Sequence, residues 1–148
     1  MNQKQFDIEL QKIIKNTIDI TWDYIYNFND LDGIYLYVLL GTIKSSDIVF
    51  VYKEVPYKKH KIFNIRPDFI VTDDKQDLFN TEIMLEIEKI EELFIKYKRE
   101  MPYEIKIIYS PKTKNLDVKI GYENPFPDED SAIGDGFRNW IKSLGITM

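Results

Sequence analysis

Hydrophobic residues recur at helical spacing in the first part of the chain. Charged side chains fill the positions between them, so one face of a helix would be apolar and the other polar. This pattern predicts an amphipathic helix over about residues 3 to 19. Its apolar face would carry Phe6, Leu10, Ile13, Ile14, Thr17 and Ile18.

Beyond Trp22 the period changes to two, which is typical of a strand. The stretch WDYIYNF alternates and ends at NDLDG, where Asp32 and Gly33 suit a hairpin turn. Two runs rich in β-branched and aromatic residues follow, GIYLYVLL and DIVFVYKEV. We expect an antiparallel meander of these three segments. Residues 55–72 contain two prolines and no clear period, which predicts an irregular crossover that can hold a short edge strand.

The clearest helical signal lies in residues 73–100. Acidic residues at its start and basic residues at its end suit the helix dipole, and Pro102 stops the helix. A second hairpin follows, with apolar side chains on one face on either side of the turn SPKTKN. The stretch DGFRNWIKSLGI predicts a short final helix that ends at Gly145. The helical stripe consists of Phe79, Ile83, Ile87, Ile90, Phe94 and Tyr97, and the hairpin face of Tyr103, Ile105, Ile107, Tyr109, Leu116, Val118, Ile120 and Tyr122.

Together these elements predict an α+β fold of one domain, residues 1–148, in the order α-βββ-(β)-α-ββ-α. The meander and the C-terminal hairpin would form an antiparallel sheet with the helices packed on one face. GIYLYVLL and DIVFVY are apolar on both faces. The crossover and the N-terminal helix would cover the second face, or else a partner would do so.

Composition narrows the class of protein. The chain has 148 residues, 44% hydrophobic, and a net charge of -5, which favours a folded domain over a disordered one and disfavours a general nucleic-acid binder. There are no cysteines, so disulfides and thiolate metal sites are excluded. The longest apolar stretch, GIYLYVLLGTI, is too short to span a bilayer. We therefore expect a soluble cytoplasmic protein that contacts neither nucleic acid nor membrane directly; the pattern does not fix its oligomeric state.

Catalytic motifs are weak. The single histidine, His60, lies among lysines in YKKHK, no serine stands in a nucleophile elbow, and no glycine-rich phosphate loop is present. One signature of a Mg²⁺-dependent nuclease-like hydrolase remains: Asp68 in RPDF with Glu104 and Lys106 in YEIKI. A long helix separates Asp68 from the other two, so we interpret Glu104 and Lys106 as solvent-face strand residues. We expect no enzyme activity, no metal and no cofactor.

Acidic residues cluster in two places, and each is either a solvated face or a partner surface. The long helix carries like-charged pairs at i,i+4, which cost some helix stability. The second cluster, YENPFPDEDSAIGDG, does not follow the calcium-loop spacing. Opposite charge speeds encounter with a basic partner, and aromatic side chains anchor interfaces. The candidate partner-binding residues are Glu82, Glu86, Glu123, Phe126, Asp128, Glu129, Asp130, Asp135 and Trp140.

Three stretches carry a family resemblance. They are the N-terminal helix running into IDITWDYIYNF, the segment LFIKYKREMPYEIKIIY with the hairpin NLDVKIGYENP, and the closing FRNWIKSLGI. In these stretches the chain resembles the YezG-like family of bacterial immunity proteins, the antitoxins of polymorphic and contact-dependent nuclease toxins. It departs from that family at Met101-Pro102-Tyr103, where a Trp is common, and at KTKN, where the hairpin turn usually has Gly.

The resemblance implies a non-enzymatic immunity protein that binds and neutralises the C-terminal domain of a cognate toxin, a nuclease in most of the family. It carries no catalytic residues over to this chain. The acidic charge agrees with this function, because nuclease domains are basic where they hold nucleic acid and acids can occlude such a surface. Two alternatives stay open: the hydrolase that would use Asp68, Glu104 and Lys106, and a non-enzymatic adaptor module.

Overall fold

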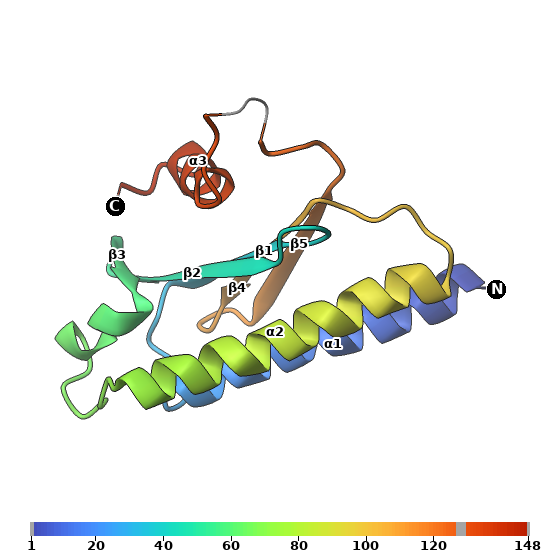
Figure 1. Cartoon of the computed structure of the whole chain (residues 1–148). Helices are drawn as coiled ribbons and strands as arrows, with labels where there is room; N and C mark the ends of the chain where they lie inside the picture. Colours follow the sequence, from blue (N-terminus) through green and yellow to red (C-terminus); the bar gives the residue numbers. More distant parts are fainter. Residues whose placement is uncertain (1, 127–129, 148) are drawn as a thin grey trace.

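An antiparallel sheet forms the middle of the molecule. In the computed structural model, which describes residues 2–126 and 130–147, the sheet has five strands in the order β3-β2-β1-β4-β5 (Figure 1). Every neighbouring pair is antiparallel, and β1 is central, between β2 and β4. This confirms the predicted α+β class. The strands are β1 (Gly33–Leu39), β2 (Ser45–Tyr52), β3 (Val55–Lys58), β4 (Glu104–Ser110) and β5 (Asn115–Gly121).

Two long helices cover one face of the sheet. α1 (Asn2–Tyr24) and α2 (Asp73–Lys96) run side by side beneath the sheet in Figure 1. The hydroxyl of Thr72 caps α2 by accepting a hydrogen bond from the backbone N–H of Lys75, at 3.1 Å. The predicted stripe of α2 faces inward, and its end contacts α1 where Phe6 packs edge-on against Phe94, with ring centroids 5.0 Å apart. The first core therefore lies between these helices and the sheet.

The third helix lies on the opposite face. α3 (Asp135–Ser143) packs over β1 and β2 in a second, smaller core, visible above the sheet in Figure 1. The expectation that the helices share one face thus holds for α1 and α2 and is wrong for α3. The apolar second face of β1 and β2 is covered by the chain itself, through α3 rather than through the crossover or α1. This second core contains Tyr37, Leu39, Val49, Phe137, Trp140 and Ile141.

The predicted strand at residues 22–28 is wrong. α1 continues through Tyr24, and the chain then turns at Tyr26 and Asn27, which have φ values of 53° and 55°. The aromatic alternation is coincidental, because Thr17, Thr21 and Ile25, at helical spacing, are all buried. The meander is instead made of β1, β2 and β3.

The crossover holds the short edge strand that its pattern allowed. This strand is β3, and a 3₁₀ helix, η1 (Lys59–Asn64), follows it directly. The C-terminal hairpin is confirmed as β4 and β5, with Ile105 opposite Ile120 and Ile107 opposite Val118. The final helix is confirmed too, and Gly145 after it has a φ of +79°. Within the described residues, no helix is long and apolar enough to cross a membrane.

Candidate functional site

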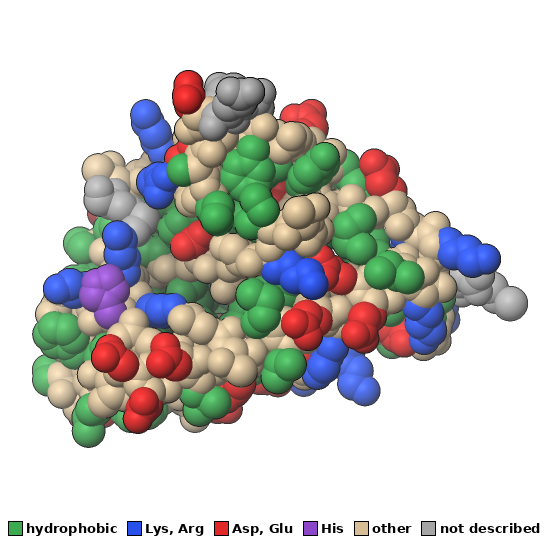
Figure 2. All heavy atoms as spheres, in the orientation of Figure 1, with side chains coloured by type: hydrophobic (Ala, Val, Ile, Leu, Met, Phe, Trp, Pro, Cys, Tyr) green, Lys and Arg blue, Asp and Glu red, His purple; other side chains and the backbone are tan. Residues whose placement is uncertain are grey.

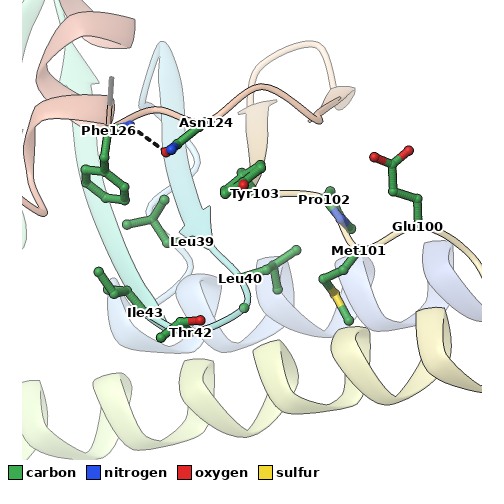
Figure 3. A pocket seen from close by; sticks show the side chains of 11 residues that line it. Leu39, Leu40, Thr42, Ile43, Glu100, Met101, Pro102, Tyr103, Asn124 and Phe126 are labelled. Carbon is green, nitrogen blue, oxygen red and sulfur yellow. Dashed lines mark hydrogen bonds between the residues drawn. The ribbon is translucent and has the colours of Figure 1, made fainter. Parts of the chain in front are cut away.

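Three connections meet at the end of the sheet where β1 stops and β4 starts. They are the β1–β2 turn, the α2–β4 connection and the segment after β5. Between them lies a cavity of about 480 Å³, which we call the end-of-sheet pocket (Figure 3). It is lined by Leu39, Leu40, Gly41, Thr42, Ile43, Glu100, Met101, Pro102, Tyr103, Asn124 and Phe126.

Hydrogen bonds fix the floor of the pocket. The Leu40 N–H donates to the Tyr103 carbonyl at 3.0 Å, which ties the β1–β2 turn to the start of β4. The nearly buried Glu91 on α2 accepts a hydrogen bond from the Gly41 N–H at 2.6 Å and forms an ion pair with Lys44 at 3.1 Å. The hydrogen bond and charge of Glu91 raise the pKa of Lys44. Because the turn is fastened to both β4 and α2, the pocket is formed before any ligand arrives.

The rim of the pocket combines apolar and acidic groups. Ile43 and Tyr103 keep 40% and 42% of their surface exposed, which is high for such large apolar side chains. Phe126 is half-buried and points toward Leu39 in Figure 3, and its N–H donates to the Asn124 side-chain oxygen at 2.8 Å. The Glu100 carboxylate points away from the cavity. An apolar cavity with this rim can receive one large apolar side chain of a partner while the acids face its cations.

The C-terminal acids are only partly available for such a contact. Glu123, next to the pocket residue Asn124, is exposed, whereas Asp130 is exposed but already has an interaction within the chain. Asp135 is occupied, because it accepts a hydrogen bond from the Ala132 N–H at 2.7 Å and pairs with Arg138 at 2.5 Å. These interactions hold the pKa of Asp135 below its usual value. Asp128 and Glu129 lie outside the described residues.

Two predicted contact residues are placed in the interior. Trp140 lies in the second core, between Tyr35 and Tyr37, with 7% of its surface exposed. Glu86 is buried as well, and its carboxylate pairs with Lys89 at 2.7 Å. The prediction that these two residues contact a partner at the surface is wrong, because both side chains are buried. Glu82 is half-buried beside a small hollow between α1 and α2, away from the end-of-sheet pocket.

The residues of the hydrolase alternative do not converge. Glu104 accepts a hydrogen bond from the Tyr37 hydroxyl at 2.5 Å and pairs with Lys106 at 3.1 Å, on the face covered by α3. Asp68 instead pairs with Arg66 at 3.1 Å, next to Phe69 in the first core on the other face. Within the described part of the chain, no group of three or more His, Cys, Asp or Glu side chains could hold a metal ion.

No protein-family model and no curated protein matches this chain.

Sequence reasoning missed a polar hollow of about 400 Å³ between α3, β2 and η1, which Figure 2 shows beside the single histidine. Asp47, Lys59, His60 and Arg138 all line it. Burial raises the pKa of Asp47, against the attraction of Lys59, and burial lowers the pKa of Lys59. The one available signal was an acid inside the apolar strand sequence SSDIVFVY, since nothing local shows that these elements meet.

Proposed function

We propose that this protein is a non-enzymatic immunity protein. It binds the C-terminal nuclease domain of a cognate bacterial toxin and neutralises that domain by occluding its basic active-site surface. The observation that carries the proposal is the end-of-sheet pocket, a largely apolar cavity that is open to solvent, with exposed apolar side chains and the exposed Glu100 at its rim and Glu123 next to it in the chain. The resemblance to YezG-like proteins supports the same function.

The pocket supports tight binding rather than chemistry. Interfaces derive most of their affinity from a few large side chains seated in preformed, desolvated pockets, and the fastened β1–β2 turn provides such a pocket. Charge adds selectivity, because the net charge of -5 attracts basic proteins and repels nucleic acid. Glu100 and Glu123, both exposed, would face the lysines and arginines that hold nucleic acid on the toxin.

The direct test is a titration of nuclease activity. A basic nuclease domain encoded beside this chain is mixed with increasing amounts of the full protein. We expect activity to fall to zero at one equivalent, because a binder acts stoichiometrically. Complete inactivation by a small fraction of an equivalent would indicate an enzyme instead, and full activity in excess protein would overturn the proposal.

Two matched pairs of variants locate the contact. Ile43→Asp places a charge at the pocket rim, and Ile95→Asp makes the same change at an exposed isoleucine on the outer face of α2. We expect the first to weaken binding by about tenfold or more and the second to leave it unchanged. Glu123→Lys should slow association and flatten its salt dependence, whereas Asp19→Lys on the solvent side of α1 should not. Equal effects within a pair would show that the toxin binds elsewhere.

A further inference from the structure

The sheet has two edges that differ in how they are protected. β3 is only four residues long and contains Pro56, which cannot donate a hydrogen bond to another strand. β5 is seven residues long, has no proline and pairs only with β4 among the described strands. Its outer backbone groups can therefore accept a further strand.

An apolar groove runs beneath this edge. It has a volume of about 740 Å³ and lies between β5 and the N-terminal half of α1. Ile8 and Leu116 on its walls keep 51% and 46% of their surface exposed. Asp7, Lys12 and Lys15 stand at its border, while Leu116, Val118 and Ile120 of β5 all point into it. The apolar face of β5 is thus only partly covered by α1.

The opposite face of β5 carries two exposed charges, Asp117 and Lys119. Asp117 lies opposite Ile108 of β4, and Lys119 lies opposite Lys106, a like charge. Among the residues that the structure describes, neither side chain makes a hydrogen bond or an ion pair. A like-charged pair directly across two strands costs stability, and opposite charges there contribute to it.

We propose that β5 pairs with β5 of a second copy of this chain, antiparallel and centred on Val118, so that the two sheets join into one. In this register Asp117 of each copy lies opposite Lys119 of the other, and Leu116 lies opposite Ile120. Two ion pairs form on one face, and the apolar residues meet above the grooves on the other. The sequence NLDVKIG is self-complementary about its central valine.

Charge also selects this register. A two-fold axis perpendicular to the joined sheet puts the apolar faces of the two β5 strands on the same side. One strand can therefore shift along the other only in steps of two residues. One step in one direction centres the pair on Asp117 and sets the two copies of that acid opposite each other. One step in the other direction centres it on Lys119 and does the same with the lysines. Both of these shifts juxtapose like charges, so the Val118-centred register is favoured over its two neighbours.

The test measures the oligomeric state of the full chain by sedimentation equilibrium, from low micromolar to near-millimolar concentration. We expect a concentration-dependent dimer. Asp117→Lys alone sets lysine against lysine at both pairs, and Lys119→Asp alone sets acid against acid. Each should weaken dimerisation by about tenfold or more. Mixing the two variants restores both ion pairs in a heterodimer, so the mixture should dimerise as wild type does.

Lys58→Asp, at an exposed position on the β3 edge, is the control and should dimerise normally. Circular dichroism of each variant checks folding, and recovery on mixing is itself proof that both singles are folded. A wild-type chain that stays monomeric up to near-millimolar concentration would overturn the proposal. So would a dimer of unchanged affinity in Asp117→Lys, or two weakened variants that fail to associate when mixed.

Discussion

Gly136 is the position where α3 comes closest to the sheet, and replacing it with alanine tests how α3 is docked. A methyl group there would overlap the Tyr37 hydroxyl and lie 2.9 Å from Cζ of the same ring, a separation that real Cβ atoms essentially never show. Tyr37 is completely buried, and its hydroxyl donates to Glu104 at 2.5 Å. The ring therefore has no easy way to move aside.

Two opposing effects set the magnitude. Alanine is better than glycine inside a helix by about 1 kcal/mol, and by less in the first turn, where Gly136 lies. Overpacking a well-packed core costs about 1–3 kcal/mol. We therefore expect Gly136→Ala to lower the free energy of unfolding by about 1–2 kcal/mol. At a glycine without this contact, the same substitution would be neutral or stabilising.

Urea unfolding followed by tryptophan fluorescence measures this loss, because Trp140 lies in α3. The control is Gly134→Ala, where the new methyl group meets only the end of the exposed, flexible Arg138 side chain. Tyr37→Phe alone loses the hydrogen bond to Glu104, but it should cost about 1 kcal/mol less in the Gly136→Ala background than in the wild type, since the overlapping oxygen is then gone. If Gly136→Ala proves as stable as Gly134→Ala, α3 does not sit on Tyr37 as described.

Three further substitutions probe other contacts. Trp140→Ala should cost about 3 kcal/mol or more by leaving a cavity in the second core, and a loss below 1 kcal/mol in urea unfolding would contradict burial of that ring. Glu91→Ala leaves the Gly41 N–H without its acceptor and should lower the free energy of unfolding by about 1.5–3 kcal/mol in the same assay. An unchanged stability would show that Glu91 does not hold the β1–β2 turn. Burial raises the pKa of Asp47 above 3.8. Ionisation of Asp47 therefore costs more free energy in the folded state than in the unfolded chain. As pH rises from 3.8 through the raised pKa, the free energy of unfolding should decrease. Asp47→Asn should therefore stabilise the protein near neutral pH and not at a pH below 3.8, and a loss near neutral pH would show that attraction to Lys59 dominates.

Periodicity in the sequence was enough for the elements whose burial is one-sided. The stripe of α2 and the alternation of β4 and β5 each define an inner face, so their type and orientation follow from the sequence. The same reasoning wrongly predicted a strand at residues 22–28, because aromatic side chains at every second position are also compatible with the end of a helix followed by a turn. β1 and β2 are apolar on both faces, and no local pattern says that α3, nearly a hundred residues later in the chain, is what covers the second face.

The site was harder to predict than the fold, because it depends on which connections meet. Phe126 and Trp140 were both predicted to contact a partner because they are aromatic residues near the acidic cluster. The structure places Phe126 at the pocket and Trp140 in the second core. Glu86 gave the impression of surface charge, since its burial beside Lys89 depends on tertiary packing that spacing does not reveal. Ile43 carried no signal, and Tyr103 was assigned to the buried face of the hairpin, because the exposure of both side chains arises only where the β1–β2 turn meets the start of β4.

Leu39 and Phe126 contribute both to the packing of α3 and to the end-of-sheet pocket. Leu39 is a member of the second core, against which Phe126 packs, and both residues also form the wall of the end-of-sheet pocket. An occupant of the pocket would therefore press on the same side chains that hold α3 in place. Amide protons of α3 should then exchange more slowly when the pocket is occupied than in the free protein, and variants that loosen α3 should weaken binding of the proposed partner.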